Sequence, residues 1–92
     1  MGEKTEFEEL KKDLENLKYI EKADIENNEG NVLITVVDFT QEFMELMGKE
    51  YYEQREQMIK DIFKIFDKHN INIEEEEFED NDTYFYIVSY LN

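Results

Sequence analysis

Few side chains of this 92-residue chain could take part in catalysis, since it contains one His, one Ser, one Arg and no Cys. His69 ends an amphipathic run, where an imidazole interacts favourably with the dipole of a helix. Ser89 lies inside an alternating apolar segment and not on the sharp turn that exposes a nucleophilic Ser. No two carboxylates stand out as an acid and base pair, and no Gly-rich loop is present to bind phosphate. We predict a protein that is not an enzyme and binds no cofactor; an enzyme with a carboxylate base is the least favoured alternative.

A calcium-binding loop is the one metal motif that the spacing of the carboxylates suggests. Residues 80–82 read Asp-Asn-Asp, as such a loop begins. The loop needs Gly at its sixth position and Glu at its twelfth. Those positions hold Phe85 and Leu91, and a second possible start at Asp24 fails at the same two positions. We therefore predict no specific metal site.

Charge is unevenly distributed along the chain, which has a formal net charge of -15 at pH 7. All ten basic residues fall within residues 1–22 and 49–68, where they nearly balance the acidic residues. Residues 23–48 and 69–92 contain no Lys or Arg and hold six and seven carboxylates. Such a surface repels nucleic acid and anionic membranes and attracts basic proteins. We expect a partner with a basic surface, and no direct binding to nucleic acid or membrane.

Amphipathic periodicity predicts two helices with a short helix between them. Thr5 and Glu8 have the spacing of a capping box at the start of the first helix. Thr40 could cap the short helix, and Gly48 would end it. We favour a break at Gly48 because one continuous helix through this region would be about 42 Å long. The expected helices cover residues 5–18, 41–47 and 49–68.

Alternating and β-branched residues predict four strands, which cover residues 20–27, 32–37, 71–79 and 84–91. Turn-forming residues lie at 27–31 and 80–83, so the strands pair as two hairpins. The order of elements is helix-strand-strand twice, or αββ-αββ. The simplest assembly is an α+β fold, in which a four-stranded, mainly antiparallel sheet of two hairpins has helices packed on one face. We expect residues 1–92 to form a single acidic α+β domain.

The densest run of charge lies in the third expected strand and the turn after it. Side chains on one face of a strand recur every ~6.7 Å, which is about two base steps of duplex DNA. Carboxylates with this spacing could occupy the positions of successive phosphates in a basic groove. The alternative is a solvated edge strand whose charges prevent aggregation. The run comprises Glu74, Glu75, Glu76, Glu77, Glu79, Asp80 and Asp82.

The last expected strand is apolar on both faces, because Tyr84, Tyr86 and Tyr90 alternate with Phe85 and other apolar residues. Helices on one side of the sheet would leave the Tyr face uncovered. Tyr combines a large apolar area with a polar tip and is enriched in protein interfaces. Three interpretations stay open: a contact with a partner, a homodimer contact, or core packed on a helix.

The size, charge and lack of catalytic groups resemble those of small acidic inhibitors, which include phage anti-restriction and anti-CRISPR proteins and the immunity proteins of nuclease toxins. This resemblance implies a non-enzymatic DNA mimic that inhibits a nuclease or another nucleic-acid-binding effector. We expect a cytoplasmic location, because no stretch has the apolar region of a signal peptide or of a transmembrane helix. The alternative is a small cytosolic adaptor or homodimeric structural protein whose charge confers solubility. The expected contacts with a partner are Glu74, Glu75, Glu76, Glu77, Glu79, Asp80, Asp82, Tyr84, Tyr86, Tyr90, Asp24, Glu26 and Glu29.

Overall fold

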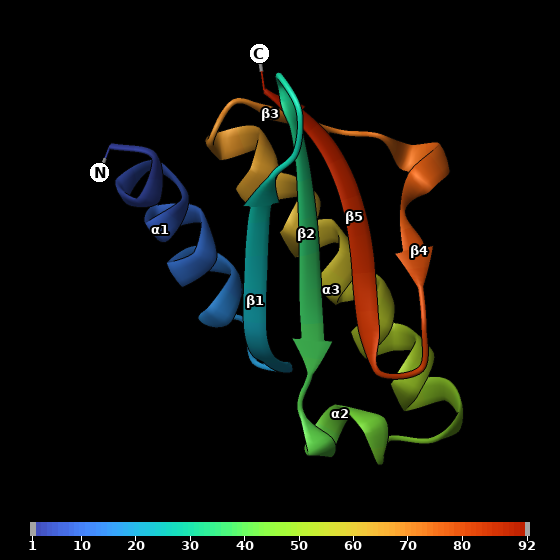
Figure 1. The fold of residues 1–92 in the computed structure, drawn as a ribbon. Helices are drawn as coiled ribbons and strands as arrows, with labels where there is room; N and C mark the ends of the chain where they lie inside the picture. The colour runs from blue at the N-terminus through green and yellow to red at the C-terminus, as the bar shows by residue number, and fades with distance from the viewer. Residues whose placement is uncertain (1, 92) are drawn as a thin grey trace.

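An antiparallel sheet with helices on one of its faces forms the architecture of the protein (Figure 1). The computed structural model describes the backbone of residues 2–91 and the side chains of residues 7–91. The expected α+β class is therefore confirmed. The elements in chain order are α1 (Gly2–Glu15), β1 (Ile20–Asn27), β2 (Val32–Phe39), α2 (Gln41–Met44), α3 (Gly48–Lys68), β3 (Ile71–Ile73), the 3-10 helix η1 (Glu75–Glu77), β4 (Glu79–Asp80) and β5 (Tyr84–Leu91).

The sheet has five strands instead of the expected four, in the order β1-β2-β5-β3, and β4 also pairs with β5. Strand β2 occupies one side of β5, so β3 and β4 follow each other along its other side. The first hairpin forms as predicted, with β1 antiparallel to β2. The second differs, because the 3-10 helix η1 divides its first strand into β3 and β4. The simple αββ-αββ order therefore does not describe the chain.

The predicted strand over residues 71–79 is wrong in its middle, where Glu75–Glu77 form η1. Consecutive Glu residues have low β-propensity, and their like charges repel one another along an extended edge. The turn also returns Phe78 to the core. Its ring centroid lies 5.0 Å from that of Phe85 and 5.8 Å from that of Phe63. The charged residues therefore leave the sheet while the aromatic residue after them packs against it.

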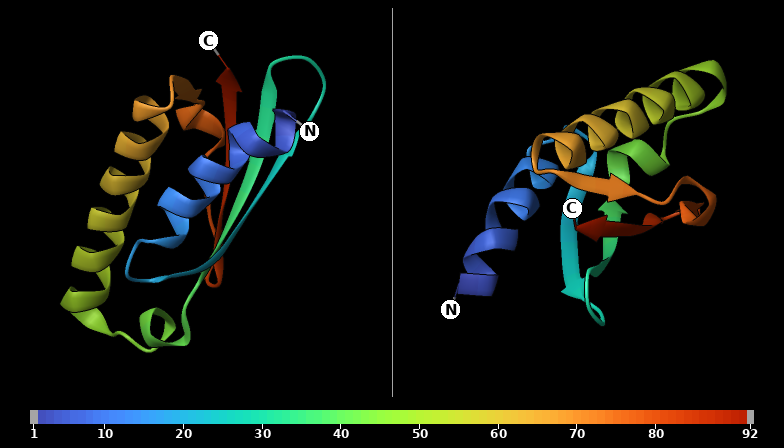
Figure 2. Two further views of the ribbon diagram at one scale, coloured as in Figure 1. Left: turned by 90° about the vertical axis from the view of Figure 1, so that its left-hand side faces the viewer. Right: turned by 90° about the horizontal axis from the view of Figure 1, so that it is seen from above.

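The core lies between the helices and one face of the sheet (Figure 2). Strand β2 alternates along its length, with Leu33, Thr35, Val37 and Phe39 buried and the residues between them half-buried. This period of two places every second side chain on the helix side. The helices contribute apolar stripes at helical spacing. The buried residues of these stripes are Leu10 and Leu14 of α1 and Met58, Ile62 and Phe66 of α3.

The ends of the helices agree with the predictions in part. Helix α1 begins at Gly2 and ends at Glu15, so Thr5 lies within the helix and not at its N-cap. The side chain of Thr5 is outside the described residues. The Oγ1 atom of Thr40 does cap α2, accepting a hydrogen bond from the Phe43 N–H at 3.2 Å. The predicted break is also confirmed, since Gly48 has φ of 58° and α3 starts there.

A polar contact joins the two long helices at the end of α3. The Asp13 carboxylate of α1 lies 2.8 Å from Nε2 of His69 and 3.1 Å from Nζ of Lys68. The hydrogen bond from His69, followed by that from Lys68, lowers the pKa of Asp13 below its usual value. His69 is the C-cap residue of α3, as its position in the sequence suggested. Its side chain ties α3 to α1.

Candidate partner-binding surface

The face of the sheet opposite the helices carries a continuous apolar strip along β2 and β5. The register pairs Val32 with Tyr90, Ile34 with Val88 and Val36 with Tyr86. Paired residues project from the same face of a sheet, and this face is the one that does not form the main core. Figure 1 looks onto it, with α3 behind the sheet. We call these six residues together with Tyr84 the open face.

The three Tyr side chains of β5 therefore lie on the uncovered side. Tyr84 and Tyr86 are half-buried, and Tyr90 is exposed at 36%. Their neighbours Phe85 and Ile87 are fully buried against the helices. The interpretation of the Tyr residues as core packed on a helix is wrong. Contact with a partner stays a prediction, for which they have the required position.

The aliphatic half of the open face was not predicted as a site. Val32, Ile34 and Val36 of β2 are half-buried, and Val88 is buried outside the main core cluster. The sequence carried a signal, since residues 32–37 contain Thr35 as their single polar residue. A strand with one solvated face normally alternates apolar with polar residues. Apolar residues at consecutive positions therefore indicated a second apolar face.

Carboxylates border the open face on both sides. On β1, Asp24 lies opposite Val36 and Glu26 lies opposite Ile34, and both acidic residues are exposed. At the end of β2, Asp38 is paired with Tyr84. On the other side of β5, Glu79 is paired with Tyr86. Lys22 of β1 is a basic residue on this border, and its Nζ lies 3.4 Å from the Asp24 carboxylate. The sheet thus combines an apolar centre with an acidic border.

The remaining acidic residues do not form the predicted ladder. Glu75, Glu76 and Glu77 are exposed on η1, so the strand spacing that suggested successive phosphates is absent. Glu74 is half-buried, and its N–H donates to the Val88 carbonyl at 2.8 Å. The structure places the run beside β5 as a charged turn.

Two further predicted residues lie at opposite ends of the sheet. Glu29 is exposed in the turn between β1 and β2, and Asp82 is exposed in the turn between β4 and β5. Because β2 and β5 are antiparallel, these turns are separated by the length of the strands. The two carboxylates therefore do not share one site, although both extend the acidic border at its ends.

Asp80 has an internal partner. Its carboxylate forms an ion pair and a hydrogen bond with the guanidinium of Arg55 on α3. Asp80 is paired with Phe85, which faces the helices, so it points away from the open face. Burial raises the pKa of the nearby Tyr51 phenol, and the negative charge of Asp80 raises it further. Asp80 thus links β4 to α3. Its role as a partner contact stays a prediction, at a position outside the open face.

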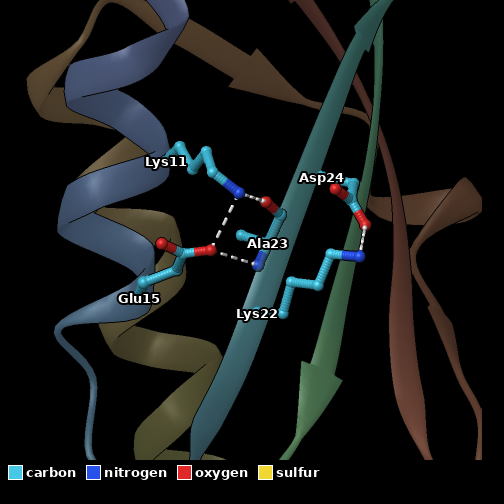
Figure 3. Close-up of polar contacts among 5 residues, drawn as sticks. All are labelled: Lys11, Glu15, Lys22, Ala23 and Asp24. Carbon is cyan, nitrogen blue, oxygen red and sulfur yellow. Dashed lines mark hydrogen bonds and ion pairs between the residues drawn. The ribbon is translucent and has the colours of Figure 1, made fainter.

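The outer edge of β1 is closed at one residue by a polar contact with α1 (Figure 3). The Lys11 ammonium donates to the Ala23 carbonyl at 2.6 Å, and the Ala23 N–H donates to Glu15 at 3.0 Å. Lys11 and Glu15 also pair with each other at 2.9 Å. The hydrogen bond from Ala23, followed by that from Lys11, lowers the pKa of Glu15. We call these three residues the edge plug.

Among the side chains of residues 7–91, no three acidic or His groups come together in a way that could hold a metal ion. None of the helices in this part of the chain is long and apolar enough to cross a membrane. Comparison of the chain with models of protein families, with curated proteins and with solved structures finds no match. The open face, its acidic border and the edge of β1 are therefore the features on which a function can be argued.

Proposed function

We propose that this protein is a non-enzymatic inhibitor that binds the basic surface of a nuclease or another nucleic-acid-binding protein and excludes its nucleic acid. One observation carries the proposal: the helices leave one face of the sheet uncovered, and that face combines apolar and Tyr side chains with bordering carboxylates. Interfaces of this kind have an apolar centre that supplies affinity and a polar rim.

The two parts of the surface have different physical roles. Burial of the apolar centre contributes about 25 cal/mol for each Å² removed from water and is not screened by salt. The acidic border acts at longer range, where it accelerates the encounter with a basic partner and weakens as the ionic strength rises. Mimicry in this sense is competition for a basic groove. It does not require carboxylates at the spacing of phosphates.

Charge also argues against a second copy of the chain as the partner. Two open faces in contact would bring their borders together, and each chain carries a formal net charge of -15. Like charges opposite one another at an interface cost several kcal/mol. A partner with a basic surface replaces this repulsion with attraction to the acidic border. The homodimer is therefore the weaker of the two candidates for covering the open face.

The order of addition tests the proposal. Immobilised protein would capture its partner from a host lysate at low salt, and the purified partner would then be mixed with labelled DNA or RNA. We expect inhibition when this protein is added first and little effect when it is added to a preformed nucleic-acid complex. Inhibition that does not depend on the order, or a partner with no affinity for nucleic acid, would contradict the proposal.

A matched pair of Tyr variants locates the contact. Tyr90→Ala removes the most exposed Tyr of the open face, whereas Tyr52→Ala removes a Tyr that is 64% exposed on α3, on the helix side. Truncation of an interface hot spot costs about 2 kcal/mol and mainly speeds dissociation. We expect this loss for Tyr90→Ala and none for Tyr52→Ala, with both variants folded. Equal binding by the two variants would exclude the open face.

A further inference from the structure

A second interaction surface lies at the outer edge of β1. Among the described strands, β1 pairs with β2 alone, so its other side has backbone groups without a neighbouring strand. Both polar backbone groups of Ala23 point to this side, because they bond to α1. In an antiparallel strand, every second residue directs its N–H and C=O to the same side. The backbone groups of Ile25 and Asn27 therefore also point outward, since the register is unbroken from Ala23 to Asn27.

The edge plug determines where a further strand could begin. Lys11 and Glu15 occupy the hydrogen-bonding groups of Ala23, as the dashed lines in Figure 3 show. An added strand cannot pair at Ala23 without breaking this contact. Beyond it, towards the β1–β2 turn, the outward groups belong to Ile25 and Asn27. The plug thus leaves a short accessible edge with a fixed start.

A hollow beside this edge could hold a side chain. It has a volume of 230 Å³ and is lined by Phe7, Glu8 and Lys11 of α1 and by Ile25 of β1. Phe7 and Ile25 are half-buried against the core, so the floor of the hollow is apolar. Helix α1 forms one wall and the strand edge forms the other. An extended segment lying on the edge would direct alternate side chains into this hollow.

The charge beside the edge identifies the partner. Asp24 and Glu26 project from β1 on the open-face side, Glu29 follows in the turn, and residues 23–48 contain no Lys or Arg. A neutral strand would gain nothing from these carboxylates, and the same edge of a second copy would be repelled by them. Lys or Arg side chains on an added strand would lie next to them, at the distance of directly opposed cross-strand pairs.

We propose that the edge of β1 binds an extended, basic segment of a partner protein by strand addition. The segment pairs with Ile25 and Asn27 and alternates an apolar side chain, placed in the hollow, with basic side chains placed beside Asp24 and Glu26. Strand addition is a general mode of peptide recognition, in which the backbone supplies affinity and alternate side chains supply specificity. The proposal is independent of the open face and of the inhibitory function proposed above.

A synthetic peptide tests the proposal directly. The probe is acetyl-Lys-Ile-Lys-Ile-Lys-amide, and the control is the same composition with the alternation broken, acetyl-Lys-Lys-Ile-Ile-Lys-amide. Titration of the full chain, followed by NMR, should shift the Ile25 and Asn27 amides and slow their hydrogen exchange. We expect the control peptide to bind at least about fivefold more weakly, since a loss near 1 kcal/mol corresponds to that factor. Equal binding of the two peptides would overturn the proposal.

Variants of one exposed residue separate backbone pairing from charge attraction. Asn27→Pro removes an outward N–H and no hydrogen bond to β2, whereas Asn27→Ala keeps the N–H. We expect the Pro variant to bind the probe about fivefold more weakly than the Ala variant, and Glu26→Gln to weaken binding mainly at low salt. Tyr90→Ala should leave the binding of the peptide unchanged. Amide shifts centred on β5, or equal affinity of the two Asn27 variants for the probe, would overturn the proposal. Neither result would contradict the function proposed for the open face. If Asn27→Pro does not fold, the test is the hydrogen exchange of the Ile25 and Asn27 amides in the unmodified protein, with and without the probe. Exchange that the probe does not slow would overturn the proposal.

Discussion

At the scale of single residues, two buried hydroxyl groups in the described part of the core have no hydrogen-bond partner there. Thr35 of β2 and Ser89 of β5 are 0% exposed, and neither oxygen has a partner among the described residues. The register places Thr35 opposite Ile87 and Ser89 opposite Leu33, so the two hydroxyls are diagonal neighbours on the helix side of the sheet. An unpaired buried hydroxyl lowers stability, because it has lost its hydrogen bonds to water.

We predict that Thr35→Val stabilises the protein. The methyl group replaces the hydroxyl at nearly the same volume and removes the desolvation cost, so the free energy of unfolding should rise by about 1 kcal/mol. The melting temperature should increase by about 4–8 °C. Urea denaturation measures the change, and Thr83→Val, at an exposed position in the turn before β5, is the matched control. A loss of stability in Thr35→Val would mean that the hydroxyl has a partner in solution.

The contact between Asp13 and His69 predicts a dependence of stability on pH. The pKa of Asp13 is lowered on folding, first by His69 and then by Lys68. A group with a depressed pKa in the folded state contributes stability above its unfolded pKa, and this contribution is lost as the pH falls through the folded pKa. The loss therefore belongs to the acid range, below the ordinary carboxyl pKa of 3.8.

Asp13→Asn tests this assignment, because it removes the titrating group and nearly preserves the shape. We expect the variant to be less stable than the unmodified protein at neutral pH, and the difference to shrink as the pH falls below 3.8. Chemical denaturation at several pH values measures the difference, which cancels the titration of the other carboxylates. Asp67→Asn, at an exposed position near the same helix end, is the control. A difference that is constant with pH would show that the contact carries no charge effect.

At the scale of elements, local patterns predicted those segments whose packing and local preferences agree. Strand β5 and helix α3 were found within one residue of their ends, because the alternation of apolar residues and the helical stripe both reflect burial. The prediction of a strand after β3 was wrong because four consecutive Glu residues carry no periodicity. The strand pattern of residues 71–73 was extended through them. What decides the shape of this segment is the packing of Phe78 on Phe63 of α3, a contact between distant parts of the chain that no local pattern contains.

The candidate surface was predictable where it depends on alternation within one strand, and not where it depends on which strands pair. Alternation along β5 placed Tyr84, Tyr86 and Tyr90 on one face, and the structure puts that face opposite the helices. The partnership of β2 with β5 could not be read from sequence, since it depends on which hairpins meet. The aliphatic half of the open face was therefore missed, and the ion pair of Asp80 with Arg55 of α3 was not foreseen.

The corner between α2 and α3 depends on the backbone of Gly48. Its φ of 58° lies in the left-handed region, and a Cβ atom added there would meet nothing within 4 Å. The effect of a substitution is therefore conformational and not steric crowding. We predict that Gly48→Ala destabilises the protein by about 1 kcal/mol. Gly48→Asn should cost less, because Asn tolerates this region. Thermal denaturation gives the ranking, and equal stability of all three chains would refute the role of the left-handed corner.

At the scale of the whole molecule, charge affects folding and association in opposite directions. The formal net charge of -15 is concentrated on segments that form the sheet and its turns, while the basic residues lie mainly on the helices. Self-repulsion lowers the stability of the folded chain. The same field attracts a basic partner and raises the rate of encounter. Removing negative charge should therefore improve folding and impair association.

The exposed turn η1 allows this opposition to be measured with one variant. Changing Glu75, Glu76 and Glu77 to Gln removes three charges from side chains that are all exposed and that carry no structural hydrogen bond in the described part of the protein. At low salt, we expect a higher free energy of unfolding and a slower association with the captured basic partner. Both differences should shrink as added salt shortens the Debye length from about 30 Å at 0.01 M to about 8 Å at 0.15 M. Denaturation and surface-binding kinetics at both salt concentrations measure them.

Dissociation should remain unchanged, because the apolar centre of the open face is intact. Faster dissociation would place η1 inside the contact, and an unchanged association rate would reduce the Glu run to a solubilising turn.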